Sequence, residues 1–210
     1  MSTLTLAEGL ARLNLGLHAE TQQKLLDYIS LVQKWNKVYN LTAVSGADKM
    51  LTHHLLDSLV VVPHVANANT ILDVGSGAGL PGIPLALALP QTRVILLDSN
   101  HKKTAFLNQA TIELELSNVE VACDRIEKYQ PKQQFNVVVS RAFSDLPAFT
   151  ELAGRLVAPD GILLAMKGAN PFEELAEINA GNGGFKCLSV MPLKVPGLDA
   201  ERHLVFLKAA

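Results

Sequence analysis

Cysteine is scarce in this sequence, which has only Cys123 and Cys187. Two isolated cysteines supply neither a disulfide framework nor the paired spacing of a cysteine-based metal cluster. We therefore expect both to be small, buried or half-buried side chains, and we expect no bound metal.

An excess of basic residues is also missing. The 210 residues include 18 Lys and Arg against 20 Asp and Glu, which gives a net charge of −2 at pH 7. This balance excludes a protein that binds nucleic acid mainly through many phosphate contacts across its surface. Any nucleic-acid site must be a local patch.

Long apolar runs are absent as well. The most apolar stretch, 80–90, is too short to span a membrane and contains three prolines. The first residues have no basic segment and carry an early acid, Glu8, so they do not resemble a secretory signal. With 49% hydrophobic and 18% charged residues, the chain has ordinary globular composition. We expect a soluble, cytoplasmic protein that folds alone, without membrane contact.

Hydrophobic spacing divides the chain at about residue 66. Before it, apolar residues recur at helical intervals, as in Leu25, Ile29 and Val32. After it, short apolar runs alternate with helix-length segments, which predicts a mostly parallel sheet with helices on both faces. The predicted strands are 71–74, 93–98, 119–123, 135–140 and 162–167, followed by a terminal antiparallel pair at 185–195 and 203–208. Asn100 is the predicted cap of a helix over 101–116.

The length fits one catalytic domain of about 150 residues. We assign residues 67–210 to this α/β domain and residues 1–66 to an N-terminal helical extension, and we expect the two to form one compact unit.

Three glycines at alternate positions follow the first predicted strand: Gly75, Gly77 and Gly79. Glycine suits a backbone that adopts positive φ close to a ligand. In a doubly wound sheet, such a loop lies in the crevice at the carboxyl ends of the strands. Asp98 ends the second predicted strand, where its carboxylate can accept hydrogen bonds from a ribose diol. A nucleotide-like cofactor is therefore expected.

Two cofactors remain possible at this loop. Residues 77–82 match the dinucleotide pattern G-x-G-x-x-G, which leaves a nicotinamide oxidoreductase as an alternative. Asp73 favours S-adenosylmethionine instead, because an acid two residues before Gly75 can hold a methionine ammonium, whereas it would repel a pyrophosphate.

Further segments of the sequence give a more specific resemblance than the glycine loop alone. Together with the glycine loop, the chain resembles the RsmG family, also called glucose-inhibited division protein B, over nearly its whole length. The residues that carry this resemblance are 34–42 (KWNKVYNLT), 54–59 (HLLDSL), 80–86 (LPGIPLA), 140–142 (SRA), 167–168 (KG) and 201–204 (ERHL).

The resemblance implies a Rossmann-like class I methyltransferase with a seven-stranded sheet. It implies methylation of guanine N7 in 16S ribosomal RNA, at guanine 527 in the usual rRNA numbering, with S-adenosylmethionine as cofactor. Family cofactor contacts carry over onto Gly75, Leu80, the Ile126–Glu127 pair and Arg141. The partner is then 16S rRNA or the small ribosomal subunit, and we expect the chain to be a monomer.

Guanine N7 has a lone pair outside the aromatic system, so it can attack a sulfonium methyl without losing a proton. No general base is needed, and catalysis then depends on alignment. Arg141, which closes the strand 137–140, is our candidate for positioning substrate and cofactor, and it requires a polar partner.

A local basic rim is the predicted RNA contact. Its candidates are Lys102, Lys103, Arg125, Arg141, Lys167, Arg202 and His203. All are expected near the carboxyl ends of the strands except Arg202 and His203. Lys102 and Lys103 could equally be an ordinary solvated helix start. We expect His53, His54 and Asp57 to brace the extension against the core, since no third metal ligand accompanies them.

Two other functions stay open at this point. One is a methyltransferase that acts on a small molecule, which the acidic balance mildly favours. The other is a noncatalytic RNA-binding or assembly factor, although the intact glycines and acids of the loop argue against it.

Overall fold

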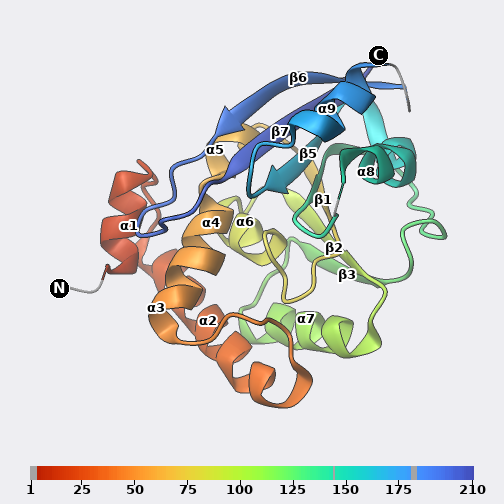
Figure 1. Ribbon diagram of the computed structural model, residues 1–210. Helices are drawn as coiled ribbons and strands as arrows, with labels where there is room; N and C mark the ends of the chain where they lie inside the picture. The colour runs from red at the N-terminus through yellow and green to blue at the C-terminus, as the bar shows by residue number, and fades with distance from the viewer. Residues whose placement is uncertain (1–3, 144, 181–183) are drawn as a thin grey trace.

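A twisted sheet between two layers of helices forms the protein (Figure 1). The computed structural model describes residues 4–143, 145–180 and 184–210. The strands are β1 (Thr70–Val74), β2 (Arg93–Asp98), β3 (Val119–Cys123), β4 (Phe135–Ser140), β5 (Val157–Lys167), β6 (Phe185–Pro192) and β7 (His203–Ala209). They form one seven-stranded sheet in the order β3-β2-β1-β4-β5-β7-β6.

Strand direction follows the predicted pattern. The pairs among β1 to β5 are parallel, and β7 runs antiparallel between β5 and β6. The α/β fold with a mostly parallel sheet and an antiparallel terminal strand is thus confirmed. Two strand bounds differ by more than one residue: β5 begins at Val157 rather than at 162, and β6 ends at Pro192 rather than at 195.

Helices precede the sheet and connect its strands. The N-terminal segment contains α1 (Leu6–Arg12), α2 (Ala19–Tyr39), α3 (Ala47–Met50), the π-helix η1 (Leu51–Leu56), α4 (Asp57–Leu59) and α5 (Val62–Val65). The later helices are α6 (Gly82–Ala88), α7 (His101–Glu113), α8 (Leu146–Ala153), the 3-10 turn η2 (Gly154–Leu156) and α9 (Phe172–Asn179). Asn100 caps α7 through bonds from the backbone N–H groups of Lys102 and Lys103, as predicted.

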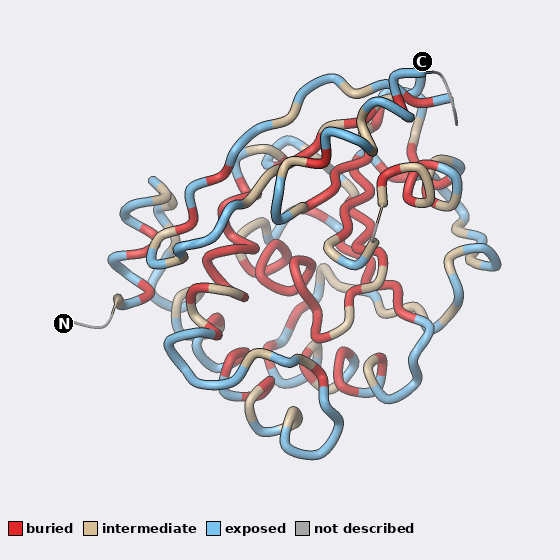
Figure 2. Tube along the Cα trace, viewed as in Figure 1, coloured by how far each residue is buried: buried red, intermediate tan, exposed pale blue. Residues whose placement is uncertain are grey.

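The core lies on both faces of the central strands, because alternate residues of a strand point to opposite sides. On one face, Ile71, Val94 and Val139 pack with the N-terminal helices, α6 and α7. On the other, Leu72 and Val138 pack with α8 and α9. Figure 2 shows the buried backbone concentrated in the sheet and in the helices that cover it. The apolar cluster on the first face includes residues both before and after position 66.

The connection between β3 and β4 differs from the other connections between β1 and β6, because residues 124–134 contain neither a helix of the α type nor a strand. This leaves the carboxyl ends of β1 and β2 less covered on the face of α8 and α9. A cavity lies there.

Two predictions from the sequence concern the solvent exposure of the cysteines and contact with a membrane. Cys187 is half-buried, but Cys123 is exposed, which corrects the prediction that both cysteines are sheltered. The reason is that Cys123 ends β3, which is the edge strand of the sheet. Among the described helices, none combines the length and apolar character required to cross a membrane.

Candidate active site

The glycine loop and the end of β4 meet at the carboxyl edge of the sheet. β1 and β4 are neighbours, and the chain leaves them toward opposite halves of the sheet, which is where open α/β sheets bind ligands. Gly75 has φ +71°, and a Cβ at Gly75 would lie 2.7 Å from the Cβ of Ala142. Gly77 and Gly79 also have positive φ, as predicted. Only glycine at position 75 allows the two segments to pass so closely.

Asp98 fastens this loop to the end of β2. Its Oδ2 accepts a hydrogen bond from the Gly77 N–H at 2.8 Å, and its Oδ1 accepts one from the Asn100 N–H at 2.9 Å. The carboxylate is largely buried but lines a cavity. Because each oxygen can accept more than one bond, Asp98 keeps capacity for a ligand hydroxyl.

Asp73 lies beneath the loop and is fully buried. Its Oδ2 accepts a hydrogen bond from the Gly82 N–H at 2.9 Å, whereas Oδ1 has no partner among the described residues. Burial raises the pKa of this carboxyl from 3.8 to about 7, and the bond from Gly82, the nearby Ser76 hydroxyl and the charge of Arg141 oppose that rise. A buried acceptor without a partner is costly in a folded protein, so this oxygen is a candidate ligand contact.

The cavity at this edge has a volume of about 430 Å³. It contains four of the predicted cofactor residues, Gly75, Asp98, Ile126 and Glu127, and two of the predicted RNA residues, Lys103 and Arg125. Two further lining residues, Asp124 and Ala142, adjoin residues predicted from the sequence, whereas Val74, Leu97, Ser99, Phe143 and Leu152 were not predicted. The other predicted cofactor residues, Asp73, Gly77, Gly79, Leu80 and Arg141, do not line it.

Residues that frame the cavity are held by a side chain that sequence reasoning missed. Arg155 donates to the backbone carbonyl oxygens of Ile126 and Tyr129. Phe143 packs on Phe149 with ring centroids 5.0 Å apart. Nothing in the local sequence pattern marks Arg155, which comes from η2, far along the chain from the loop that it holds.

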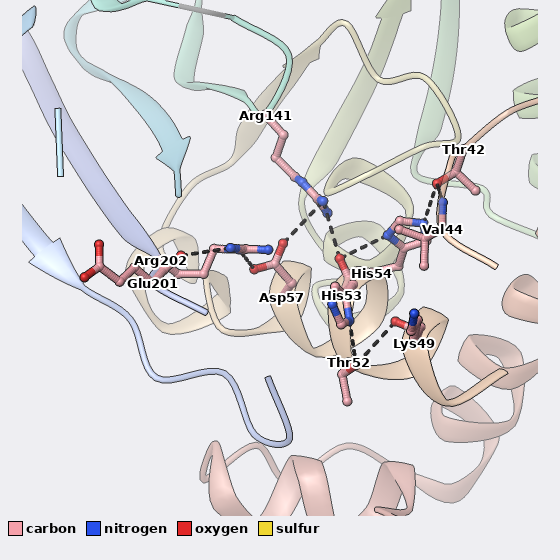
Figure 3. Close-up of polar contacts among 10 residues, drawn as sticks. All are labelled: Thr42, Val44, Lys49, Thr52, His53, His54, Asp57, Arg141, Glu201 and Arg202. Atoms are coloured by element: carbon pink, nitrogen blue, oxygen red, sulfur yellow. Dashed lines mark hydrogen bonds and ion pairs between the residues drawn. The ribbon is translucent and has the colours of Figure 1, made fainter. Parts of the chain in front are cut away.

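Arg141 has the polar partner that its position requires. Its Nη2 lies 3.3 Å from Oδ2 of Asp57 and 3.4 Å from the carbonyl oxygen of His53, both in the N-terminal helices (Figure 3). Asp57 also accepts a bond from Nε of Arg202 at 2.8 Å. Of the three residues expected to brace the extension, Asp57 joins it to the end of β4 and to the start of β7, and His53 does so only through its carbonyl oxygen. The His54 ring bonds instead to Thr42, within the N-terminal segment.

The position of Arg202 and His203 corrects the sequence prediction that set them apart from the carboxyl edge. β7 runs antiparallel, so it begins where the parallel strands end, and His203 pairs in register with Lys167. His203 shares a hydrogen bond with the Gly168 carbonyl oxygen through Nδ1. Lys167 forms an ion pair with Glu174 at 2.9 Å. Lys102 is exposed at the start of α7.

Comparison with known proteins decides between the remaining families. The family model described as rRNA small subunit methyltransferase G matches residues 21–205. The chain belongs to this family.

Relatives within the methyltransferase G family align with almost all of the chain. A protein of Chromobacterium violaceum named ribosomal RNA small subunit methyltransferase G is 51% identical, over 98% of this chain and 97% of that protein. A protein of the same name from Nitrosospira multiformis is 52% identical, over 98% of this chain and 96% of its own length. The resemblance drawn from the sequence motifs is confirmed, and the nicotinamide alternative is set aside.

Solved structures agree on the fold. A SAM-dependent methyltransferase from Aquifex aeolicus superposes with a TM-score of 0.61 at 18% identity, over 84% of this chain and 97% of that chain. A glycopeptide N-methyltransferase in complex with sinefungin gives 0.64 at 10% identity, over 75% and 87%. Family and fold confirm S-adenosylmethionine as the predicted cofactor.

The residues present suit that cofactor. The positive-φ glycines provide close backbone approach, Asp98 provides acceptors, and Ile126 and Phe143 provide apolar surface. Within the described part of the chain, Oδ1 of Asp73 and Nη1 of Arg141 have no partner. They are a buried acceptor and a buried donor, which match the ammonium and carboxylate of an amino acid. Among the described residues, no group of three or more His, Cys, Asp or Glu side chains is placed to hold a metal.

Proposed function

We propose that this methyltransferase methylates N7 of a guanine in 16S rRNA of the small ribosomal subunit, guanine 527 in the usual rRNA numbering. The observation that carries the proposal is the cavity between the glycine loop and β4, with Arg141 following β4, in a chain whose relatives at about 50% identity are named for small-subunit rRNA methylation. We further propose that residues 1–66 form an extension of the catalytic domain, and that the chain acts in the cytoplasm as a monomer.

The cofactor-binding roles follow from the geometry of the loop. Asp98 would accept bonds from the ribose, and Ile126, with Glu127 beside it, would frame the adenine. Gly75, Gly77 and Gly79 give the loop its path, and Leu80 packs behind it. Asp73 and Arg141 would hold the amino-acid end, since Arg141 is close enough to lower the pKa of Asp73.

The chemistry needs orientation more than proton transfer. When bound, S-adenosylmethionine supplies an electrophilic methyl group, and guanine N7 attacks it with a lone pair that carries no proton. The protein's task is to align the base, an effect that contributes roughly 7 to 11 kcal/mol in favourable cases. Arg141 is our proposed positioning cation, and a donor placed on N7 itself would block attack, so its contacts must go to O6, phosphate or cofactor.

The proposed RNA contact is a basic rim at the same edge. Lys102, Lys103 and Arg125 flank the cavity on one side, while Lys167, Arg202 and His203 lie on the other, at the ends of β5 and β7. Lys167 pairs with Glu174 and Arg202 pairs with Asp57, so the proposed rim depends most on Lys102, Lys103 and Arg125. Because the whole chain has no excess of basic residues, a local group of cations is the kind of nucleic-acid site that its composition allows.

The decisive experiment offers the purified protein and methyl-labelled cofactor to unmethylated 16S rRNA, to small subunits and to a mixture of small-molecule acceptors. We expect label in RNA or subunits. Transfer only to small molecules, or RNA binding without any transfer, would replace the proposal with one of the two alternatives. Exposed Arg125 and Glu127 at the cavity rim favour a large acceptor over an enclosed small one.

A further inference from the structure

One buried carboxylate connects three distant parts of the chain. Asp57 follows η1, Arg141 follows β4, and Arg202 precedes β7, yet both guanidinium groups contact the same carboxylate (Figure 3). The Asp57 side chain is 2% exposed, against 24% for Arg141 and 22% for Arg202. The carboxylate is therefore fixed inside the protein, while both cations reach toward the surface.

Asp57 determines where the Arg141 guanidinium can lie. Alternation along β4 places Arg141 on the face of Val137 and Val139, toward the N-terminal helices. There Nη2 meets Asp57 and the His53 carbonyl oxygen, and Nη1 is buried without a partner among the described residues. Two of the contacts of this guanidinium thus come from the extension, and the N–H donors of Nη1 are left for another molecule.

The charge balance of the cluster makes Asp57 hard to replace. One negative carboxylate lies between two positive guanidinium groups, so the cluster carries a net charge of +1. Arg202 is additionally fixed by its bond from Nη1 to the Glu201 carbonyl oxygen at 2.8 Å. Without the carboxylate, the two guanidinium groups would repel each other across a partly buried space. Arg141 can relieve that repulsion only by moving.

We propose that Asp57 is a positioning residue for methyl transfer: it holds Arg141 in the orientation that the reaction uses, and it ties that orientation to the N-terminal helices and to Arg202. This inference rests on the proposed function, because it assigns to Arg141 a role in the transfer. It gives the helical extension a part in catalysis without direct contact between Asp57 and either substrate.

A double-mutant cycle separates positioning from a general structural effect. Asp57→Asn keeps the size of the side chain and removes its charge. We expect kcat/KM for methyl transfer to fall about 10- to 100-fold, as for other residues that orient a functional group. In an Arg141→Met background, the same Asp57→Asn change is expected to alter kcat/KM less than about twofold, because the group that it orients is already gone. Additive losses in the two backgrounds would overturn the proposal.

Folding is followed in the same samples by circular dichroism and thermal melting, with rates measured well below the melting transition. If Asp57→Asn does not yield folded protein, the cycle is run with Asp57→Glu, which keeps the charge but shifts it by one methylene; the same non-additivity is expected. Glu120→Gln is the matched control, since it breaks the exposed Arg93–Glu120 pair of 2.6 Å at the start of β2, and it should leave kcat/KM unchanged.

Failure of the inference and failure of the proposed function give different results. A wild-type protein that transfers no methyl group to RNA contradicts the function itself. A wild-type protein that does so, with Asp57→Asn equally active, contradicts only the role of Asp57.

Discussion

The hydroxyl of Tyr28 donates a hydrogen bond to the carbonyl oxygen of Ala78 at 2.5 Å. Tyr28 lies in α2, in the N-terminal segment, and Ala78 lies in the glycine loop. Tyr28 is fully buried, and burial raises the pKa of its hydroxyl well above 10, so it remains a donor at any physiological pH. The extension therefore supports the cofactor loop through Tyr28 as well as the end of β4 through Asp57.

Tyr28→Phe should weaken both the loop and the cofactor site. The change leaves the Ala78 carbonyl buried without that donor, which costs about 1 to 3 kcal/mol. We expect a lower melting temperature and weaker S-adenosylmethionine binding by calorimetry. Tyr39→Phe, on the same helix but with a 41% exposed side chain, is the control and should change neither. Equal behaviour of the two variants would show that the Tyr28 bond does not support the loop.

Gly75→Ala should disrupt the cofactor site directly. An added Cβ would meet Ala142 at 2.7 Å, at a residue with φ +71°. Non-glycine residues in that backbone region cost about 1 to 2 kcal/mol before any clash. We expect loss of stability in denaturant titrations and loss of cofactor binding. Gly16→Ala has open space around it and no positive φ, so it should be neutral or slightly stabilising.

Asp73 should make cofactor binding depend on pH. Its pKa of about 7 means that it is protonated in the free protein below that pH, whereas a ligand ammonium requires the carboxylate. We expect the Kd of S-adenosylmethionine to rise as pH falls from 7 to 5.5, by up to about tenfold per unit. Asp73→Asn should bind more weakly and show no such slope. A wild-type Kd that stays constant over this range would remove Asp73 from the ammonium site.

The same carboxyl should affect folding stability in a defined direction. Since its pKa is higher in the folded state than its ordinary 3.8, the stability that it contributes is complete below pH 3.8 and is lost as pH rises through 7. Burial lowers the pKa of His54, whose contribution is instead lost as pH falls below 6.5. Comparing wild type with Asp73→Asn by urea unfolding cancels the His54 effect. The variant should gain stability relative to wild type as pH rises from about 4 to 7, and the difference should stay constant above pH 7.

Lys102 provides a test of the basic rim. If it contacts a phosphate, Lys102→Ala should weaken RNA binding and reduce the slope of log K against log salt by about 1. Lys132→Ala removes an exposed lysine from the segment before β4, at the opposite edge of the sheet, and should leave the slope unchanged. Identical slopes for the two variants would indicate that Lys102 is only a solvated residue at a helix start.

The sequence predicted the sheet well, because central parallel strands such as β2 are buried on both faces and appear as short apolar runs. It predicted the path of Gly75, Gly77 and Gly79 for the same local reason: positive φ favours glycine. The predicted start of β5, at residue 162, was later than the observed start at Val157, because Ala158, Pro159 and Asp160 interrupt the apolar pattern.

Long-range contacts were beyond the reach of local patterns. Asp57 and Arg202 are 145 residues apart, and their contact depends on β7 entering the sheet antiparallel at the carboxyl edge. We predicted Arg202 to lie away from that edge, because the spacing of apolar runs in the sequence does not give the order of strands in the sheet. Asp57 had the expected bracing role, but its two partners could be identified only in three dimensions.

The central claim is tested most directly by locating the methyl group. Unmethylated 16S rRNA and small subunits are incubated with the protein and S-adenosylmethionine, digested with nuclease, and analysed by mass spectrometry of the nucleosides and of the fragments that carry them. We predict N7-methylguanosine at a single site, guanine 527, and its loss with Arg141→Ala. A methyl group on another atom or at another nucleotide, or none in either RNA substrate, would contradict the account.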